Sequence, residues 1–168
     1  MILGGFATPE GTRRYAERFR GKAAEGHFRT MQGPGDSPGL FLSSVGIGTY
    51  LGEPEEAADR AYGEAVAAAV ESGANVIDTA INYRCQRSER VIGHALRALR
   101  EKGFSRDEIW VATKGGFIPS DGAYPRDRNW FEETYVKTGI LRQDEVVAGC
   151  HALSARYIRD QLERSLSN

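Results

Sequence analysis

The chain has little of what marks several large classes of protein. Its 168 residues include only two cysteines, Cys85 and Cys150, which is too few for a disulfide framework and fits a reducing, cytoplasmic location. No apolar run approaches the ~20 residues that span a bilayer, and the first residues lack the apolar core of a signal peptide. With 22 basic and 23 acidic side chains, neither sign of charge predominates. We therefore expect no nucleic acid and no membrane as partner.

The most informative stretch runs from Val76 to Arg90. It opens with two β-branched residues, which are typical of a short buried strand, and Asp78 stands where that strand should end. Tyr83 follows on the connecting turn. A second short apolar strand, expected over 109–113, leads directly into Lys114. If the two strands are parallel neighbours, Asp78, Tyr83 and Lys114 converge at one solvent-reachable rim.

Strand and helix patterns alternate along the rest of the chain, with about 30 residues per unit. Strands are expected at 43–49, 76–78 and 109–113, and helices at 53–73, 88–103 and 154–168. A short turn with capping-box spacing is expected at 105–108. This alternation predicts an α/β fold built of βαβ units around a parallel sheet.

The two remaining segments are less regular. Residues 1–39 are polar and rich in glycine and proline, with turn signals at 8–11 and 33–39. They form either an N-terminal hairpin, with strands at 27–31 and 40–42, or a partly disordered leader. The connection at about 116–152 is far longer than a usual βα loop. Its aromatic residues either line a pocket or pack on one another.

Three segments together resemble the aldo/keto reductases: 46–50, 76–96 and 111–116. The resemblance implies a (β/α)8 TIM barrel, of which residues 40–168 would be the N-terminal part. A complete barrel takes ~250 residues, so about three βα units fit here, and the barrel is expected to be incomplete. The resemblance further implies reduction of a small-molecule aldehyde or ketone with NADP(H), or with NAD(H), as the cofactor.

The same resemblance assigns a role to each candidate site residue. Tyr83 would deliver a proton to the carbonyl oxygen, Lys114 would stabilise the phenolate, and Asp78 would hold Lys114 in place. The structural alternative is a packed loop tyrosine beside an ion pair.

The resemblance also places part of the cofactor site. Gly48, Thr49, Tyr50 and Asp78 would lie against the nicotinamide. We predict no metal site.

The family also uses a histidine at the end of a fourth strand, and this chain has none in that context. His27, His94 and His151 are read as surface or packing residues. Catalysis is therefore expected to need the remaining half of the barrel or self-association. The alternative function is a non-catalytic, nucleotide-sensing or regulatory module of the same fold.

Several weaker signals have alternative readings. Gly46 and Gly48 begin a Rossmann-like fingerprint, but Leu51 occupies the position that needs a small residue. Cys85 is either a bystander or a redox-sensitive thiol near the site. Three arginines are read as a solvated helix start, with phosphate binding as the alternative: Arg84, Arg87 and Arg90.

Overall fold

A parallel sheet of three strands in the order β3–β4–β5 forms the centre of the computed structural model, which describes residues 4–33, 35 and 38–168. Strand β3 spans Ile47–Gly48, β4 spans Val76–Asp78 and β5 spans Trp110–Ala112. The predicted parallel pairing of the second and third of these strands is confirmed. In the described part of the chain the sheet stays open and does not close into a barrel.

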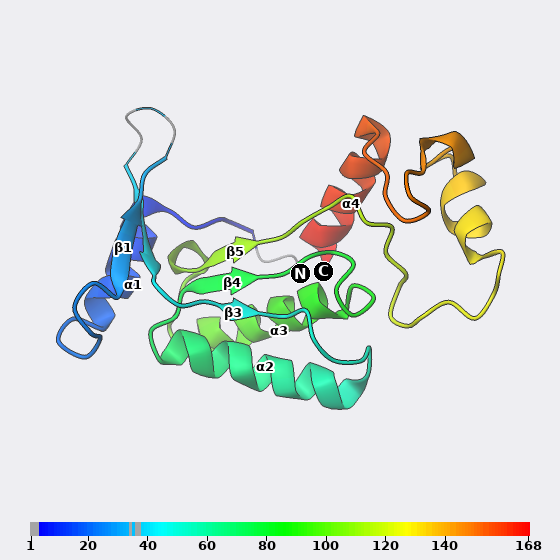
Figure 1. Ribbon diagram of the computed structural model, residues 1–168. Helices are drawn as coiled ribbons and strands as arrows, with labels where there is room; N and C mark the ends of the chain where they lie inside the picture. Colours follow the sequence, from blue (N-terminus) through cyan, green and yellow to red (C-terminus); the bar gives the residue numbers. More distant parts are fainter. Residues whose placement is uncertain (1–3, 34, 36–37) are drawn as a thin grey trace.

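Two helices cover one face of this sheet, α2 (Glu56–Glu71) and α3 (Arg87–Glu101), as Figure 1 shows. Ile77 of β4 is fully buried between the sheet and these helices. It belongs to one core cluster with the predicted apolar stripes of both helices, which include Val66, Val70 and Leu99. Because side chains alternate along a strand, Val76 and Asp78 face the other way, and both are only half-buried.

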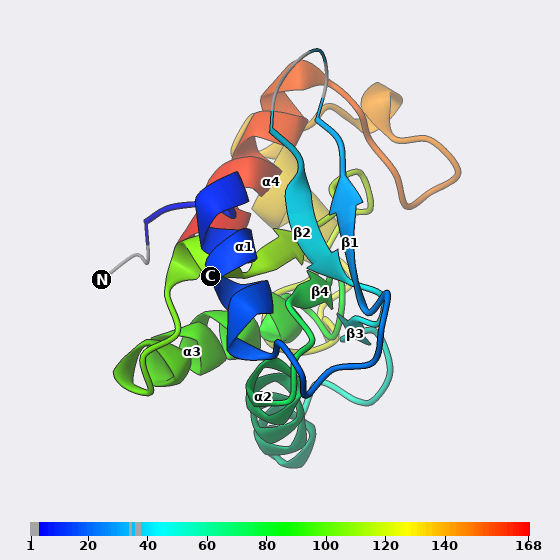
Figure 2. The same cartoon turned by 90° about the vertical axis from the view of Figure 1, so that its left-hand side faces the viewer.

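An N-terminal unit closes the amino ends of the strands. It consists of helix α1 (Pro9–Arg18) and the strands β1 (Phe28–Met31) and β2 (Leu40–Ser43). The two strands pair antiparallel, so the expected hairpin is present, and Figure 2 shows α1 packed beside it. Residues 34 and 36–37 of the turn expected at 33–39 lie outside the described residues.

The turn predicted at 8–11 is wrong, because these residues start helix α1. Thr8 is the N-cap and accepts a hydrogen bond from the Gly11 amide, and a proline follows it in the first turn. The helix is held by Tyr15, which is fully buried and whose hydroxyl donates to the Val70 carbonyl at 2.5 Å. The same residue types serve turns and helix starts, and this tertiary contact decides between them.

The first barrel strand, predicted over 43–49, is shorter than expected. Ser43 belongs to the hairpin strand β2, and the parallel strand begins only at Ile47. Asn75 links the two sheets here. Its side-chain oxygen accepts from the Ser43 amide at 2.8 Å, and its side-chain nitrogen donates to the carbonyls of Phe41 and Glu108.

The predicted capping-box turn is confirmed as the 3-10 helix η1 (Arg106–Glu108). Glu108 is fully buried, and its carboxylate accepts from the Ser105 amide and from the guanidinium groups of Arg14 and Arg18. A buried carboxylate is stable only with such partners. Glu108 therefore ties α1 to the start of β5.

The long connection after β5 builds a second, smaller core. It contains a π-helical turn η2 (Glu132–Val136) and a 3-10 helix η3 (Gln143–Glu145), and it leads into α4 (Ala155–Ser167). The buried members of this core are Tyr135, Leu141, Ala152 and Tyr157. Trp130 and Phe131 pack against them, so these loop aromatics pack on one another and on α4. Figure 1 shows the long connection and α4 beyond the carboxyl ends of the parallel strands.

No helix in the described ranges is both long enough and apolar enough to cross a bilayer.

The hydroxyl of Tyr15 provides a test of how α1 is attached to the sheet layer. Replacing Tyr15 with phenylalanine leaves the buried Val70 carbonyl without this donor, and we expect the free energy of unfolding to fall by about 1–2 kcal/mol. Urea denaturation followed by circular dichroism measures the change. Tyr124→Phe, at a largely exposed tyrosine, is the control and should leave the stability unchanged. Equal stability of the Tyr15 variant would contradict the role given to this bond.

Candidate functional site

The ammonium group of Lys114 is the centre of the candidate site. It lies 2.8 Å from both carboxylate oxygens of Asp78 and 2.8 Å from the Thr79 carbonyl oxygen. It also contacts the Tyr83 hydroxyl at 3.4 Å. The three residues predicted to converge are thus brought together at the carboxyl ends of β4 and β5.

The site is open to solvent, because the side chains of Lys114 and Asp78 are 50% and 51% exposed. Partial burial works against the charged form of Lys114. Hydrogen bonds with Asp78 and Tyr83 outweigh it and raise the pKa of Lys114 above its ordinary value. Lys114 therefore carries a positive charge throughout the physiological pH range.

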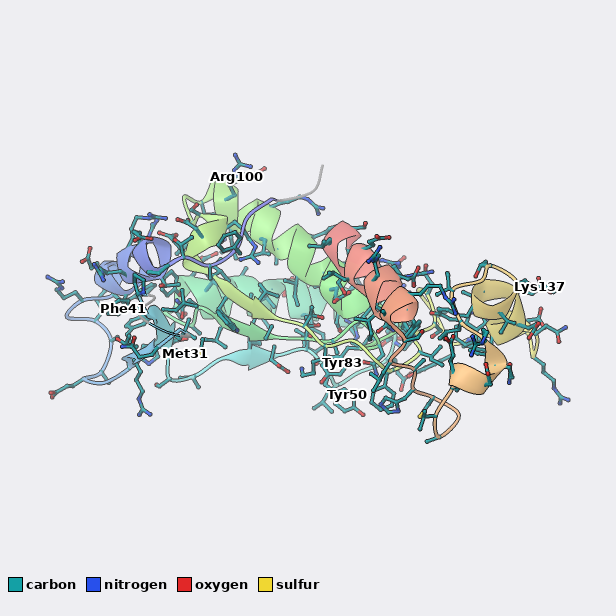
Figure 3. The ribbon with its side chains drawn as sticks, turned by 90° about the horizontal axis from the view of Figure 1, so that it is seen from above. Met31, Phe41, Tyr50, Tyr83, Arg100 and Lys137 are labelled. Atoms are coloured by element: carbon teal, nitrogen blue, oxygen red, sulfur yellow. The ribbon has the colours of Figure 1, made fainter. Side chains whose placement is uncertain are left out.

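The half-buried Tyr83 ring meets the exposed ring of Tyr50 at this rim. The Tyr50 and Tyr83 rings lie edge to face with their centroids 5.0 Å apart, and Figure 3 shows them side by side, far from Phe41 and Met31. Edge-to-face contact is a favourable geometry for aromatic pairs. The Lys114 ammonium lies 5.1 Å from the Tyr83 ring centroid. The phenol is therefore bounded by the Lys114 cation and by the Tyr50 ring.

The segment that carries Tyr50 is fixed by buried hydroxyl groups. Thr49 donates from its hydroxyl to the Thr79 hydroxyl at 2.9 Å, and its amide donates to the Asp78 carbonyl. The Ser88 hydroxyl donates to the Thr49 carbonyl at 2.7 Å. Thr49 is itself buried, whereas Gly48 is exposed, and a Cβ placed at Gly48 would meet nothing within 4 Å. The predicted residues 48–50 thus border the site, with Thr49 beneath it.

The Rossmann-like interpretation of Gly46 and Gly48 is wrong for this chain. In such a fingerprint the glycines open a helix, but β3 ends at Gly48 and α2 begins only at Glu56. Gly46 has a packing reason instead. A Cβ at this position would lie 2.9 Å from the Val76 carbonyl oxygen, so only glycine lets β3 approach β4 so closely.

The solvated helix start predicted for the three arginines is also wrong in part. Arg84 is buried, and α3 begins at Arg87 with Gln86 as its N-cap. Arg84 and Arg87 both pair with Asp59 of α2. Arg90 is the most exposed of the three, with 40% of its side chain accessible, and it pairs with Asp121 at 2.6 Å. Cys85 is buried, which fits the bystander interpretation.

The three histidines lie apart from the Asp78–Tyr83–Lys114 group. His27 lies within 3.0 Å of the Gly73 carbonyl at the amino end of the sheet, and His94 is an exposed residue of α3. His151 packs against Phe117, with ring centroids 3.6 Å apart and the two rings tilted by 46°. Within the described ranges, no histidine hydrogen-bonds to the three site residues, and no cluster of three or more His, Cys, Asp or Glu is placed to hold a metal ion.

One contributor to the site, and the burial of one residue that follows Tyr83, were missed from the sequence. The Thr79 carbonyl accepts a hydrogen bond from Lys114. It is a backbone group, so the residue types in the sequence do not predict this bond. Arg84 gave a misleading signal, because a basic residue near a helix start is usually solvated. The sequence signal that could have predicted the burial of Arg84 is Asp59, an acid in the first turn of the preceding helix, which pairs with Arg84.

Comparison with known proteins identifies relatives of this chain. A family model described as "Aldo/keto reductase family" matches residues 44–168. Morphine 6-dehydrogenase of Pseudomonas putida is 30% identical over 102 residues, which cover 61% of this chain and 30% of that protein. Methylglyoxal reductase YeaE of Escherichia coli K12 is 38% identical over 78 residues, which cover 46% and 27%. The chain thus spans less than a third of the length of these relatives.

Two solved structures of aldo/keto reductases from Klebsiella pneumoniae also match. One, in complex with NADP and acetate, is 32% identical with a TM-score of 0.34, over 38% of this chain and 22% of that one. The other, in complex with NADPH, is 32% identical with a TM-score of 0.36, over 44% and 24%.

The pair of Lys114 and Asp78 provides a test of the site's electrostatics. Because the folded protein raises the pKa of Lys114, the pair's contribution to stability is complete below the pKa of an unfolded lysine. That contribution is lost as the pH rises through the folded value. Asp78→Asn removes the carboxylate, so we expect it to lower the pKa of Lys114, as followed by NMR titration of the lysine side-chain signals.

A matched variant, Asp144→Asn, removes an exposed carboxylate that pairs with Arg142 in the long connection. It should leave the titration of Lys114 unchanged. A Lys114 titration that is the same with and without the Asp78 carboxylate would show that the pair does not determine its charge.

Proposed function

Because the chain belongs to the aldo/keto reductase family, we propose that it carries the catalytic rim of an NADP(H)-dependent oxidoreductase that reduces aldehydes or ketones. The observation that carries the proposal is the Lys114 ammonium, which is bound by Asp78 and in contact with the Tyr83 hydroxyl. In this proposal the three βα units form the N-terminal part of a (β/α)8 barrel. The half-exposed face of the sheet is then covered by the remaining half of the barrel or by self-association.

Each of the three side chains has a separate physical task. Reduction of a carbonyl places negative charge on its oxygen, and Tyr83 delivers the proton that neutralises this charge. Lys114 stabilises the phenolate that Tyr83 leaves behind, since its cation is held next to the hydroxyl. Asp78 accepts two hydrogen bonds from Lys114 and so keeps the ammonium charged and directed.

The residues around this group leave room for a flat ring such as the nicotinamide of the cofactor. Gly48 leaves its surroundings open, and Tyr50 presents a ring that is 66% exposed. Gly48, Thr49, Tyr50 and Asp78 are therefore the residues proposed to hold the nicotinamide of NADP(H), or of NAD(H) as the alternative. When bound, the nicotinamide supplies the hydride. Thr49 acts from below, by fixing the backbone that leads into Tyr50.

A second candidate function is a non-catalytic module that binds nucleotide and reports redox state. The observation that favours it is the absence, among the described residues, of any histidine bonded to the Asp78–Tyr83–Lys114 group. Titration of the chain with NADPH, followed by nicotinamide fluorescence, separates the two functions. Tight binding with little or no turnover of a generic aldehyde favours the module, and turnover favours the reductase. The absence of NADPH binding would count against the module and indicate that this chain needs the rest of the barrel.

Substitution of the proton donor tests the reductase directly. In Tyr83→Phe the ring remains but the proton is lost, so we expect kcat for reduction of a generic aldehyde to fall by about 10²–10⁴-fold. Nicotinamide absorbance follows the reaction. Undiminished reduction by this variant would rule out Tyr83 as the acid.

Lys114→Met removes the cation from the phenol and should also lower kcat. Its matched control is Lys102→Met, which removes an ammonium group that pairs with Glu71 at the opposite end of α3. The control should keep the activity of the unaltered protein. Equal losses in the two lysine variants would mean that the effect of Lys114 is not local to the site.

A further inference from the structure

Three successive residues after Tyr83 have a left-handed backbone. Arg84, Cys85 and Gln86 have φ angles of 49°, 56° and 68°, and none of them is glycine. Each such residue costs free energy, because its Cβ crowds the following carbonyl oxygen, and a run of three is unusual. Side-chain contacts must therefore hold this segment, which we call the left-handed turn (residues 84–86).

The strongest of these contacts come from Arg84, whose side chain is 1% exposed. Its guanidinium donates to the Glu53 carbonyl at 3.1 Å, to the Glu55 carbonyl at 3.3 Å and to the Asp59 carboxylate at 2.5 Å. It also lies over the Tyr62 ring, 5.1 Å from the centroid. The planar guanidinium thus links the left-handed turn both to the backbone before α2 and to a carboxylate in the first turn of α2.

The carboxylate that receives Arg84 stays charged. Partial burial opposes the charge on Asp59, but hydrogen bonds from Arg87 and Arg84 outweigh it and lower the pKa of Asp59 below its ordinary value. The ion pair between Arg84 and Asp59 therefore persists at neutral pH.

The rest of the left-handed turn is tied to the long connection after β5. The Gln86 side chain donates to the Ser120 carbonyl at 3.0 Å, and the Cys85 carbonyl accepts from the Gly122 amide at 2.9 Å. The backbone immediately after Tyr83 is thus held on both sides, by the segment before α2 and by the segment after β5.

The phenol of Tyr83, by contrast, has weak contacts of its own. Its hydroxyl meets Lys114 only at 3.4 Å, and its ring has the edge-to-face contact with Tyr50. Its position therefore depends on the backbone that carries it.

We propose that Arg84 is a positioning residue. By holding the left-handed turn, it fixes Tyr83 against Lys114 and Tyr50. Its effect on catalysis rests on the proposed function, whereas its effect on the position of the Tyr83 ring does not.

Arg84→Gly is the sharpest variant, because glycine adopts a positive φ readily, so the side-chain contacts are lost without strain in the backbone. We expect kcat to fall by about 10²-fold, the order of effect that misplacement of a reacting group produces. The KM for NADPH should change little. Arg84→Lys keeps a charge for Asp59 but loses the planar fork, so it should restore part of the activity.

A double-mutant cycle separates positioning from a general structural effect. If Arg84 acts through Tyr83, Arg84→Gly causes no further loss of kcat when Tyr83 is already phenylalanine. Full additivity of the two losses would overturn the inference. Arg60→Gln, at an exposed arginine of α2 that pairs with Glu56, is the matched control and should leave kcat unchanged.

A measurement without turnover makes the two proposals distinguishable. NMR should show nuclear Overhauser contacts between the Tyr50 and Tyr83 rings in the full chain, and these should weaken or vanish in Arg84→Gly. Retention of the Tyr50–Tyr83 contacts in both Arg84 variants would overturn the inference. If Arg84→Gly unfolds, the same measurement on Arg84→Lys provides the test, and unchanged contacts in that variant would overturn the inference. Activity retained in Tyr83→Phe would instead defeat the proposed function and leave the test of ring position intact.

Discussion

The register between β4 and β5 is the constraint on which the candidate site depends. Asp78 stands opposite Ala112, so Lys114 lies two residues beyond the paired position, on the same face of the sheet. At about 3.3 Å per residue, this places the lysine backbone roughly 6–7 Å past Asp78. The long lysine stem covers that distance and returns its ammonium to the Asp78 carboxylate. A shift of one residue would send the lysine to the opposite face, toward the helices.

Buried contacts at both ends of the strands protect this register. At the amino end, Asn75 bonds to the hairpin and to the Glu108 carbonyl, which precedes β5. At the carboxyl end, the Thr79 amide, just after β4, donates to the Ala112 carbonyl of β5 at 2.8 Å. Between them, Ile77 packs on the helices beneath. Polar groups buried in this way are costly to leave unpaired, so they penalise any alternative pairing of the strands.

The features that were predictable from the sequence are local ones. Strand patterns at 76–78 and 109–113, each followed by a charged or polar residue, were enough to predict two parallel neighbours and the meeting of Asp78, Tyr83 and Lys114. What could not be predicted depends on partners distant in the chain. Helix α1 is decided by the contact of Tyr15 with Val70, and the burial of Arg84 is decided by Asp59. Neither Val70 nor Asp59 lies in the sequence next to its partner. The start of α1 was therefore predicted as a turn, and Arg84 was predicted to be solvated.

The second core, formed by the long connection and α4, helps to fix the chain segments that leave the site. Gln161 of α4 is buried, and its side chain accepts from the Gly116 amide at 2.6 Å and donates to the Phe117 carbonyl at 2.7 Å. These bonds fix the chain just after Lys114, while the left-handed turn fixes the chain just after Tyr83. The two segments are joined to each other through Ser120 and Gly122. The long connection therefore contributes to the site by fixing the segments that follow β4 and β5. Most of its aromatic side chains pack in its own core.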